Sequence, residues 1–587
     1  MLNEKFIRVL TINLTTGETR IDDRPDLMKY LGGTGIAGKL MQEHYKKGLE
    51  PTSPEQPIVF AIGAGTFIFP ILTKVVAVFV SPLTGEYGES HAAGRLGMAM
   101  LMARYDAIVI IGRSRKPCYL AINESGVNIR EAGAMWGMPI EETGRVIRGN
   151  EHGDGNASGK RSVIRIGPAG ENGVAYACVN VDSYRHFGRM GLGASMGSKH
   201  LKGITIYGNC SIPVMNKRQY FKVFREIYNR CVNSEGMTKY HELGTPSNVL
   251  PLNKAGALPT LNMKMNQYEH AEAVSGEAFA EKNLVRKVAC PGCSVGCIHI
   301  GMYRHEFAEG HEYEAINVTY DFELIFSLGT FLGIKTTDEI LYIIEVVEET
   351  GVDAMSVGVC LGWATEALEK GLISIDDTIV DLKFGDSASY IKAVEYIALG
   401  KNQFYRDLGK GCRFVSEKYG GEDFAMQIGG NEMSGYHTGY GSLVGMAVGT
   451  RHSHLCNAGY AIDQGMKEFD EDAFVNALFK EEYERCMTNS LVLCLFARRI
   501  YDRKTILSAL NSIGWELTDE DLDIMGKRIL QTKLQLKRDM GFDVRDIKLP
   551  KRYFETPSMH GVLDEATAYR LIEKYAEKTD ALLREEF

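Results

Sequence analysis

The stretch "NKRQYFKVFREIYNRCV", residues 216–232, marks where the chain changes from strand-type to helix-type patterning. Its apolar residues recur at three- and four-residue spacing. This spacing places Tyr220, Phe221, Phe224, Ile227 and Tyr228 on one stripe of a predicted helix. The change at about residue 212 predicts a β-rich N-terminal part followed by helical parts.

The patterns on either side of this stretch agree with that division. Upstream, short apolar runs separated by glycine turns ("PIVFAIGAG", "KVVAVFV", "YDAIVIIG", "KGITIYG") are typical of buried strands, and one helix is predicted from near Arg95. Downstream, "TTDEILYIIEVVEETG" has early acidic residues and ends before Gly351, while "TDEDLDIMGKRILQTKLQLKRDMG" starts with a Thr518–Asp521 near-capping box. We predict an α+β fold with a β-rich domain over residues 1–208 and mainly helical domains over 209–415 and 416–587.

Composition narrows the functional class. The chain has 587 residues, 45% hydrophobic residues and a formal net charge of −9, which is ordinary for a globular protein and unlike a nucleic-acid binder. No apolar run reaches the ~18 residues of a membrane span. The N-terminus, "MLNEKFIRVLTINLTTGE", alternates like a strand and lacks the features of a secretory signal, so we expect a cytoplasmic protein. In such a setting, clustered members of the 12 cysteines are metal ligands rather than crosslinks.

A glycine motif near the N-terminus is a weak signal. "GGTGIAG" contains the Gly33-x-Gly35-x-x-Gly38 spacing of dinucleotide-binding loops, but "DDRPDLMKYL" before it indicates a short helix where that motif needs a strand. Glycine flexibility in a helix-to-helix connection is the better interpretation.

The segment "CPGCSVGC" is a stronger signal, because Cys290, Cys293 and Cys297 fall within eight residues. An iron–sulfur cube takes four cysteine ligands, and this segment supplies three. The alternatives are a structural zinc site and chance clustering. Zinc sites use paired ligands, and His299 lies too close to Cys297 to form the usual second half.

The ordered motifs of the chain resemble those of the tungsten-containing aldehyde:ferredoxin oxidoreductase family. The resemblance covers nearly the whole length. It includes "INLTTGE" (12–18), "YLGGTGIAGKLM" (30–41), "SPLTGEYGESHAAG" (81–94), "IGPAGENGVAYA" (166–177), "GRMGLGASMGSKHLKGI" (188–204), the cysteine trio, "EGHEYE" (309–314) and "TGVDAMSVG" (350–358).

The resemblance implies a β domain that forms the base for a tungsten (or molybdenum) bis-pyranopterin cofactor, covered by two helical domains, with a [4Fe–4S] cluster beside one pterin. It allows for magnesium between the pterin phosphates. The implied reaction oxidises an aldehyde to a carboxylic acid and passes electrons to ferredoxin or to a separate iron–sulfur subunit of a homo- or hetero-oligomer. No nucleic-acid partner is implied.

The resemblance also assigns residues. It places the catalytic groups at Glu312 or Glu314 and at His454, with His452 as the neighbouring candidate. It completes the metal ligands Cys290, Cys293 and Cys297 with Cys494, for which Cys456 is the main competitor. The expected cofactor contacts are Lys74, His91, Ala93, Arg185, His186, Gly188, Asp353, Asn489 and Leu493. For Asp353, a helix N-cap is the alternative.

Several departures from the family pattern leave the substrate open. The family's Asp-x-x-Gly-Leu-Cys is "NSLVLC" here, with Asn489 and Val492 at the altered places, and "INVTYDFELIFSLGTFLG" replaces a shorter stretch. A second hypothesis is a catalytic subunit resembling the tungsten class of benzoyl-CoA reductase in a larger electron-transfer complex. A third, non-catalytic electron-transfer or scaffold protein is disfavoured by pterin-type segments in three regions.

Overall fold

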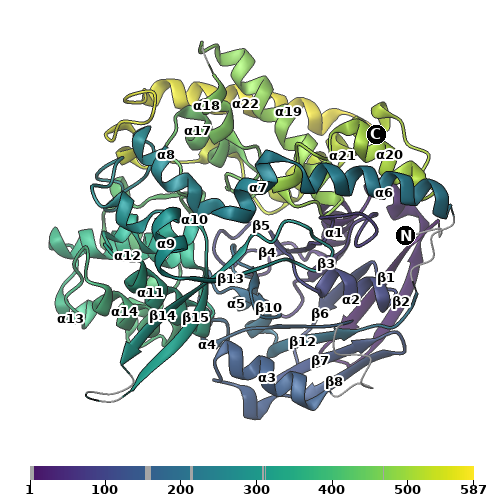
Figure 1. Ribbon diagram of the computed structural model, residues 1–587, viewed down its shortest axis with the longest axis horizontal. Coiled ribbons are helices and arrows are strands. Elements are labelled where there is room, and N and C mark those ends of the chain that lie inside the picture. The colour runs from purple at the N-terminus through teal and green to yellow at the C-terminus, as the bar shows by residue number, and fades with distance from the viewer. Residues whose placement is uncertain (1–4, 152–159, 212–215, 307–309, 311, 467) are drawn as a thin grey trace.

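The computed structural model describes residues 5–151, 160–211, 216–306, 310, 312–466 and 468–587. A β-rich part is followed by mainly helical parts, which confirms the predicted α+β class. In Figure 1 the N-terminal strands lie on one side, α11–α14 lie on the other, and the C-terminal helices run across the top of both. Among the described residues, no helix is both long and apolar enough to cross a membrane.

Two six-stranded sheets form the N-terminal part. The first has the order β2-β1-β6-β3-β4-β5 and the second β11-β10-β9-β12-β7-β8. Among the described strands of these two sheets, the β1–β6 and β7–β12 pairs are parallel and the others antiparallel. The strands are β1 (Ile7–Asn13), β2 (Thr19–Arg24), β3 (Ile58–Ala61), β4 (Val75–Val80), β5 (Tyr87–Ala92), β6 (Ala107–Ile111), β7 (Cys118–Asn123), β8 (Gly126–Glu131), β9 (Arg161–Arg165), β10 (Val179–Val181), β11 (Arg185–Phe187) and β12 (Leu201–Tyr207).

Helices accompany these sheets and form most of the remaining chain. The N-terminal ones are α1 (Gly33–His44), α2 (Leu96–Met102), α3 (Ile140–Asn150), α4 (Pro168–Glu171) and α5 (Leu192–Ser198). The middle region holds α6 (Lys217–Val232), α7 (Glu235–Glu242), α8 (Val249–Lys254), α9 (Gly276–Lys282), α10 (Phe322–Leu328), α11 (Thr337–Thr350), α12 (Ala354–Glu369), α13 (Ile375–Thr378), α14 (Ser387–Leu399), α15 (Gln403–Leu408) and α16 (Cys412–Tyr419). A three-stranded sheet in this region comprises β13 (Leu284–Val288), β14 (Ile298–Glu306) and β15 (Tyr313–Tyr320).

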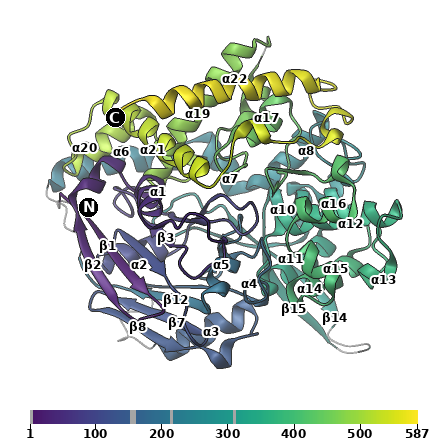
Figure 2. The same cartoon turned by 180° about the vertical axis from the view of Figure 1, so that it is seen from behind.

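The C-terminal region consists of helices that pack on both earlier regions. They are α17 (Tyr440–Val448), α18 (Gly459–Gly465), α19 (Glu471–Ser490), α20 (Arg503–Ser512), α21 (Asp519–Asp539) and α22 (Glu565–Arg584), with a short hairpin of β16 (Gln427–Ile428) and β17 (Asn431–Glu432) before them. Figure 2 shows α22 running over this side of the molecule. One large core joins the first sheet to α19–α21, and another joins α10–α16 to α17 and α22. The second core crosses the predicted boundary near residue 415, which remains a prediction.

Local signals explain where several of these helices begin and end. The Thr336 side chain accepts a hydrogen bond at the start of α11, and Gly351 closes that helix with a φ of 77°. Thr518 and Asp521 form a full capping box at the start of α21. Both helices lie where their sequence patterns predict them.

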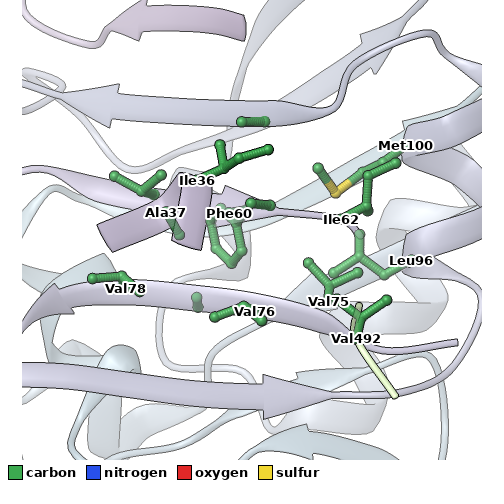
Figure 3. Close-up of a cluster of buried hydrophobic side chains, with 14 of the residues drawn as sticks. Ile36, Ala37, Phe60, Ile62, Val75, Val76, Val78, Leu96, Met100 and Val492 are labelled. Atoms are coloured by element: carbon green, nitrogen blue, oxygen red, sulfur yellow. The ribbon is translucent and has the colours of Figure 1, made fainter. Parts of the chain in front are cut away.

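Close backbone contacts join the C-terminal region to the first domain. A Cβ atom at Gly33 would lie 2.5 Å from the Asn489 carbonyl oxygen, and the Gly35 amide donates to Ser490 Oγ over 3.0 Å. The glycines of "GGTGIAG" therefore permit close approach to the end of α19. In Figure 3, Val492 lies among buried side chains of the first domain, including Val75 and Leu96.

A buried ionic network makes a second junction between these regions. Glu89 on β5 is buried and lies 3.0 Å from Lys533 Nζ of α21, 3.5 Å from Arg451 and 2.8 Å from His91 Nε2. Several partners offset the cost of burying the Glu89 charge, because each can stabilise the carboxylate in a low-dielectric interior.

Candidate active site and thiol group

The predicted cysteine ligands are held by the first domain. Cys290, Cys293 and Cys297 lie between β13 and β14, and Cys494 follows α19. The Ile71 amide donates to the Gly292 carbonyl over 3.0 Å, while the Ile71 carbonyl accepts from the Cys494 amide over 3.3 Å. One residue of the first domain thereby fixes the backbone of both cysteine segments.

Three of the four thiols lie around Arg185, which is at the start of β11, and the fourth, Cys293, neighbours these three thiols. Arg185 Nε lies 3.3 Å from Cys290 Sγ and a terminal nitrogen lies 3.9 Å from Cys297 Sγ, and Cys494 also acts electrostatically on this guanidinium. Burial raises the pKa of Cys293 to about 12 and that of Cys297 to about 11, with the neighbouring thiols acting in the same direction. Without metal the Cys293 and Cys297 thiols are therefore protonated at neutral pH, and metal binding at these two residues would displace protons.

Cys456 and Cys486 belong to a different environment. Both side chains are buried. The Cys486 thiol lies near Lys533 and the Cys456 thiol, and the Cys456 thiol also lies near the Arg451 guanidinium. The structure thus brings Cys494, and not Cys456, to the cysteine trio.

A carboxyl–imidazole pair lies at the start of α10. Asp321 caps this helix by accepting from the amides of Glu323 and Leu324. Glu323 Oε2 accepts from the Gly435 amide over 3.0 Å, and Oε1 lies 3.3 Å from His454 Nε2. Local helix geometry and a distant loop together orient the Glu323 carboxyl group.

Burial sets the protonation of this pair. It raises the pKa of Glu323 to about 8, and the nearby Asp321 carboxyl acts in the same direction. Burial also holds the pKa of His454 well below its usual range, assisted by Arg189, Arg451 and other cations. At neutral pH the pair therefore contains a neutral imidazole and a mostly protonated carboxyl group.

Basic side chains near the pair have unused donors. Arg189 lies 3.4 Å from Asp353 Oδ2 and donates to the Glu432 carbonyl oxygen over 2.7 Å. Its remaining terminal nitrogen has no hydrogen-bond partner among the described residues. The same is true, within that part of the chain, of Arg451 Nε and a terminal nitrogen of Arg485. Buried, unpaired guanidinium nitrogens of this kind fit an anionic ligand such as a phosphorylated pterin.

The other predicted cofactor residues lie in two places, where the first domain contacts the segment after α19 and where β11 contacts the middle region. At the first, the Lys74 amide donates to the Val492 carbonyl, Leu493 bridges Leu72, and Asn489 is buried. Asp353 adopts the N-cap alternative, since it accepts from the Met355 and Ser356 amides, while it also faces Arg189.

At the second of these places, β11 carries His186, whose Nε2 lies 2.7 Å from Glu348. Gly188 follows that strand and adjoins Asp353. The His91 side chain lies 2.8 Å from the Glu89 carboxylate through its Nε2 atom, and Ala93 is half-buried between β5 and α2. Contact of any of these residues with a cofactor remains a prediction.

The predicted glutamates are not brought to this site. Glu312 and Glu314 are exposed on the β14–β15 side, where Glu314 pairs across the hairpin with His305. Residues 309 and 311 of their motif lie outside the described residues. His452 instead lies 3.4 Å from Glu86 and 3.0 Å from Lys537. Sequence reasoning missed Glu323, although the acidic Asp-x-Glu directly after an apolar strand is a signal for a helix start.

The fold and the site define a class: an α+β protein with a β-rich N-terminal part, a group of four neighbouring cysteines and a buried acid–histidine pair. Two family models match the chain. These are the aldehyde ferredoxin oxidoreductase N-terminal domain over residues 9–208 and domains 2 and 3 of the same family over residues 222–579. The chain belongs to the aldehyde ferredoxin oxidoreductase family.

Individual relatives agree with this assignment. A tungsten-containing aldehyde ferredoxin oxidoreductase of Pyrococcus furiosus is 31% identical over 95% of this chain and 92% of its own length. An aliphatic sulfonate oxidoreductase, WOR-like subunit, from the same organism is 27% identical over 93% of this chain and 89% of its own. The active site complex BamBC of benzoyl coenzyme A reductase with 1,5-dienoyl-CoA shares the fold, with a TM-score of 0.81 at 20% identity, covering 98% of this chain and 94% of that chain.

Proposed function

We propose that the chain is a tungsten (or molybdenum) bis-pyranopterin oxidoreductase with a [4Fe–4S] cluster. It oxidises an aldehyde to a carboxylic acid in the cytoplasm and passes the electrons to ferredoxin or to a separate iron–sulfur subunit. The observation that carries the proposal is the gathering of four thiols near Arg185, in a member of this family. Arg185 also acts electrostatically on Asp321, two residues before Glu323 of the Glu323–His454 pair.

The spacing of the thiols favours a cluster over a single zinc ion. Zinc–sulfur bonds of about 2.3 Å in tetrahedral geometry place ligand sulfurs roughly 3.8 Å apart. No three of Cys290, Cys293, Cys297 and Cys494 have their sulfurs all within 4.8 Å of one another, and all four are among the described residues. A larger metal–sulfide core that separates its ligands suits this arrangement.

The pterin cofactor would be held by groups of opposite character. Arg189, Arg451 and Arg485 supply unpaired donors for phosphate oxygens, with magnesium as a further counter-ion, while the Asp353 carboxylate can accept from pterin ring N–H groups. When bound, the metal centre supplies the two-electron acceptor for the oxidation.

The Glu323–His454 pair supplies the proton chemistry. Glu323 Oε1 faces one imidazole nitrogen of His454, and Nδ1 of the same ring has no partner among the described residues. Because His454 is neutral, the pair can hold one proton and transfer it between a substrate oxygen or water at Nδ1 and the carboxyl group. Glu323, with a pKa of about 8, is the final proton acceptor and is ionised in the active form.

Elemental analysis together with an aldehyde panel tests the proposal. Anaerobically purified protein should contain about four irons and acid-labile sulfides and one tungsten or molybdenum per chain, and should reduce a viologen with an aldehyde. Zinc at one per chain without iron would exclude it. A full metal complement with no turnover of any aldehyde would favour the second hypothesis, a benzoyl-CoA-reductase-like subunit.

A further inference from the structure

Helix α6 has more apolar surface than its packing uses. Val223, Ile227 and Cys231 are buried against the body of the protein. Phe221, Tyr228 and Val232, by contrast, are 59%, 43% and 44% exposed.

The exposed residues form one stripe, since positions 221, 225, 228 and 232 follow helical spacing. Arg225 lies within this stripe, and all four side chains point away from the buried face of the helix. An apolar strip of this kind, interrupted by an arginine, is typical of an interaction surface.

The same helix is strongly basic in an acidic protein. Its 16 residues contain five Lys or Arg and a single carboxylate, Glu226, whereas the whole chain has a net charge of −9. Lys217, Arg218, Lys222 and Arg225 are exposed, and none forms an ion pair with any described residue. Their charge is therefore available to a partner.

A hollow lies at the C-terminal end of this strip. It is lined by Asn229, Arg230, Asn233, Ser234, Arg499 and Ile500. Arg230 is partly neutralised by Asp502 over 3.2 Å and Arg499 has no ion pair within the described chain, so the hollow keeps a positive character suited to a carboxylate.

This surface lies directly over the thiol group. The hydroxyl of Tyr501 donates to the Pro70 carbonyl, and the Cys231 and Cys293 thiols both act on this tyrosine. On the neighbouring helix α7, Tyr240 stacks on Phe496 with ring centroids 4.1 Å apart, two residues beyond Cys494. Figure 1 shows α6 beside α20 and close to α7. A protein bound on the outer face of α6 would therefore be separated from the thiol group by this helix and by Tyr501.

We propose that the outer face of α6, with the adjoining Arg230–Arg499 hollow, is the docking site for a small acidic iron–sulfur electron carrier. The inference rests on the proposed function, because it requires electrons to leave through the Cys290–Cys494 thiol group. Basic groups steer an acidic carrier to the surface, and Tyr228, Phe221 and Val232 supply the apolar centre that keeps it there.

A charge-reversed variant tests the site. Lys222→Glu combined with Arg225→Glu should lower the rate of reduction of an acidic two-cluster ferredoxin by about 10- to 100-fold at low ionic strength, because steering is lost. Rates with a viologen, which needs no docking surface, should stay unchanged, as should iron and tungsten content. The matched control is Lys392→Glu with Lys548→Glu, which makes the same charge change at exposed, unpaired lysines elsewhere in the described chain.

Three further measurements separate the outcomes. Ferredoxin binding to immobilised holoprotein should weaken in parallel, and the neutral variant Lys222→Gln with Arg225→Gln should give an intermediate loss if the reversed variant fails to fold. An unaltered ferredoxin rate, or an equal loss in the control, would overturn the inference. A changed oligomeric state would overturn it as well, by assigning the face to a second copy of this chain. Wild-type protein that lacks iron or fails to reduce viologen would instead refute the proposed function.

Discussion

Replacing Glu323 with glutamine isolates the proton acceptor proposed for the reaction. Glutamine has nearly the same shape, so its side chain can still accept from the Gly435 amide, but it can no longer take up a proton. A positioned general base contributes about 10²- to 10⁴-fold to turnover, or roughly 2.7–5.5 kcal/mol of barrier. We expect Glu323→Gln to lower kcat/KM by that factor.

The pKa of Glu323 fixes the pH dependence that should disappear. With a pKa of about 8, the carboxyl group is ~9% ionised at pH 7 and ~91% ionised at pH 9. Because the ionised form is the base, wild-type kcat/KM should rise about tenfold over this interval and level off above it. The glutamine variant should lack this rise.

The assay is aldehyde-dependent viologen reduction from pH 6 to 10 on protein with a measured iron and tungsten content. Glu314→Gln is the matched control, since Glu314 is exposed on the hairpin and its loss should leave activity unchanged. Full activity in Glu323→Gln, or a large loss in Glu314→Gln with metal content intact, would refute the assignment and restore the prediction made from the "EGHEYE" motif.

Two other changes test the junctions between regions. Cys494→Ser should sharply reduce iron and acid-labile sulfide per chain and lower the thermal midpoint, whereas Cys456→Ser should keep a full cluster; the opposite pattern would move the fourth ligand. Lys533→Met should destabilise the fold by about 3–5 kcal/mol, because it leaves the buried Glu89 with fewer compensating partners. Adding Glu89→Gln should recover part of that loss in denaturation midpoints, and a purely additive effect would contradict the coupling.

Much of the fold was predictable because its signals are local. The buried strands are continuous apolar runs, and the capping residues of α11 and α21 lie directly at the helix ends that they stabilise. The width of the buried face of α6 was not predictable. Periodicity placed Phe221 and Tyr228 on the stripe with Ile227, but what α6 packs against decides how much of that stripe is covered.

The acid of the candidate site was missed for a related reason. Glu323 meets Gly435 and His454 across more than a hundred residues of chain, and no spacing within the sequence encodes that contact. Motif matching selected Glu312 and Glu314, which lie just before and at the start of β15, the strand that precedes Asp321 and Glu323. The "EGHEYE" motif therefore indicated the right part of the chain, but the tertiary contacts with Gly435 and His454 identify Glu323 as the buried acid.

Val492 stands where the resembling family has glycine, and it adopts a backbone conformation that favours glycine. Its φ is 55°, in the left-handed region. A β-branched residue there costs roughly 1–2 kcal/mol of backbone strain. Its side chain is completely buried among residues of the first domain, which contributes about 1.5–3 kcal/mol. Because burial offsets a strain of similar size, valine can stand two residues before Cys494 while its backbone carbonyl still accepts from the Lys74 amide. Valine at this position therefore adds backbone strain but also adds a buried apolar contact between the C-terminal region and the first domain, two residues before Cys494.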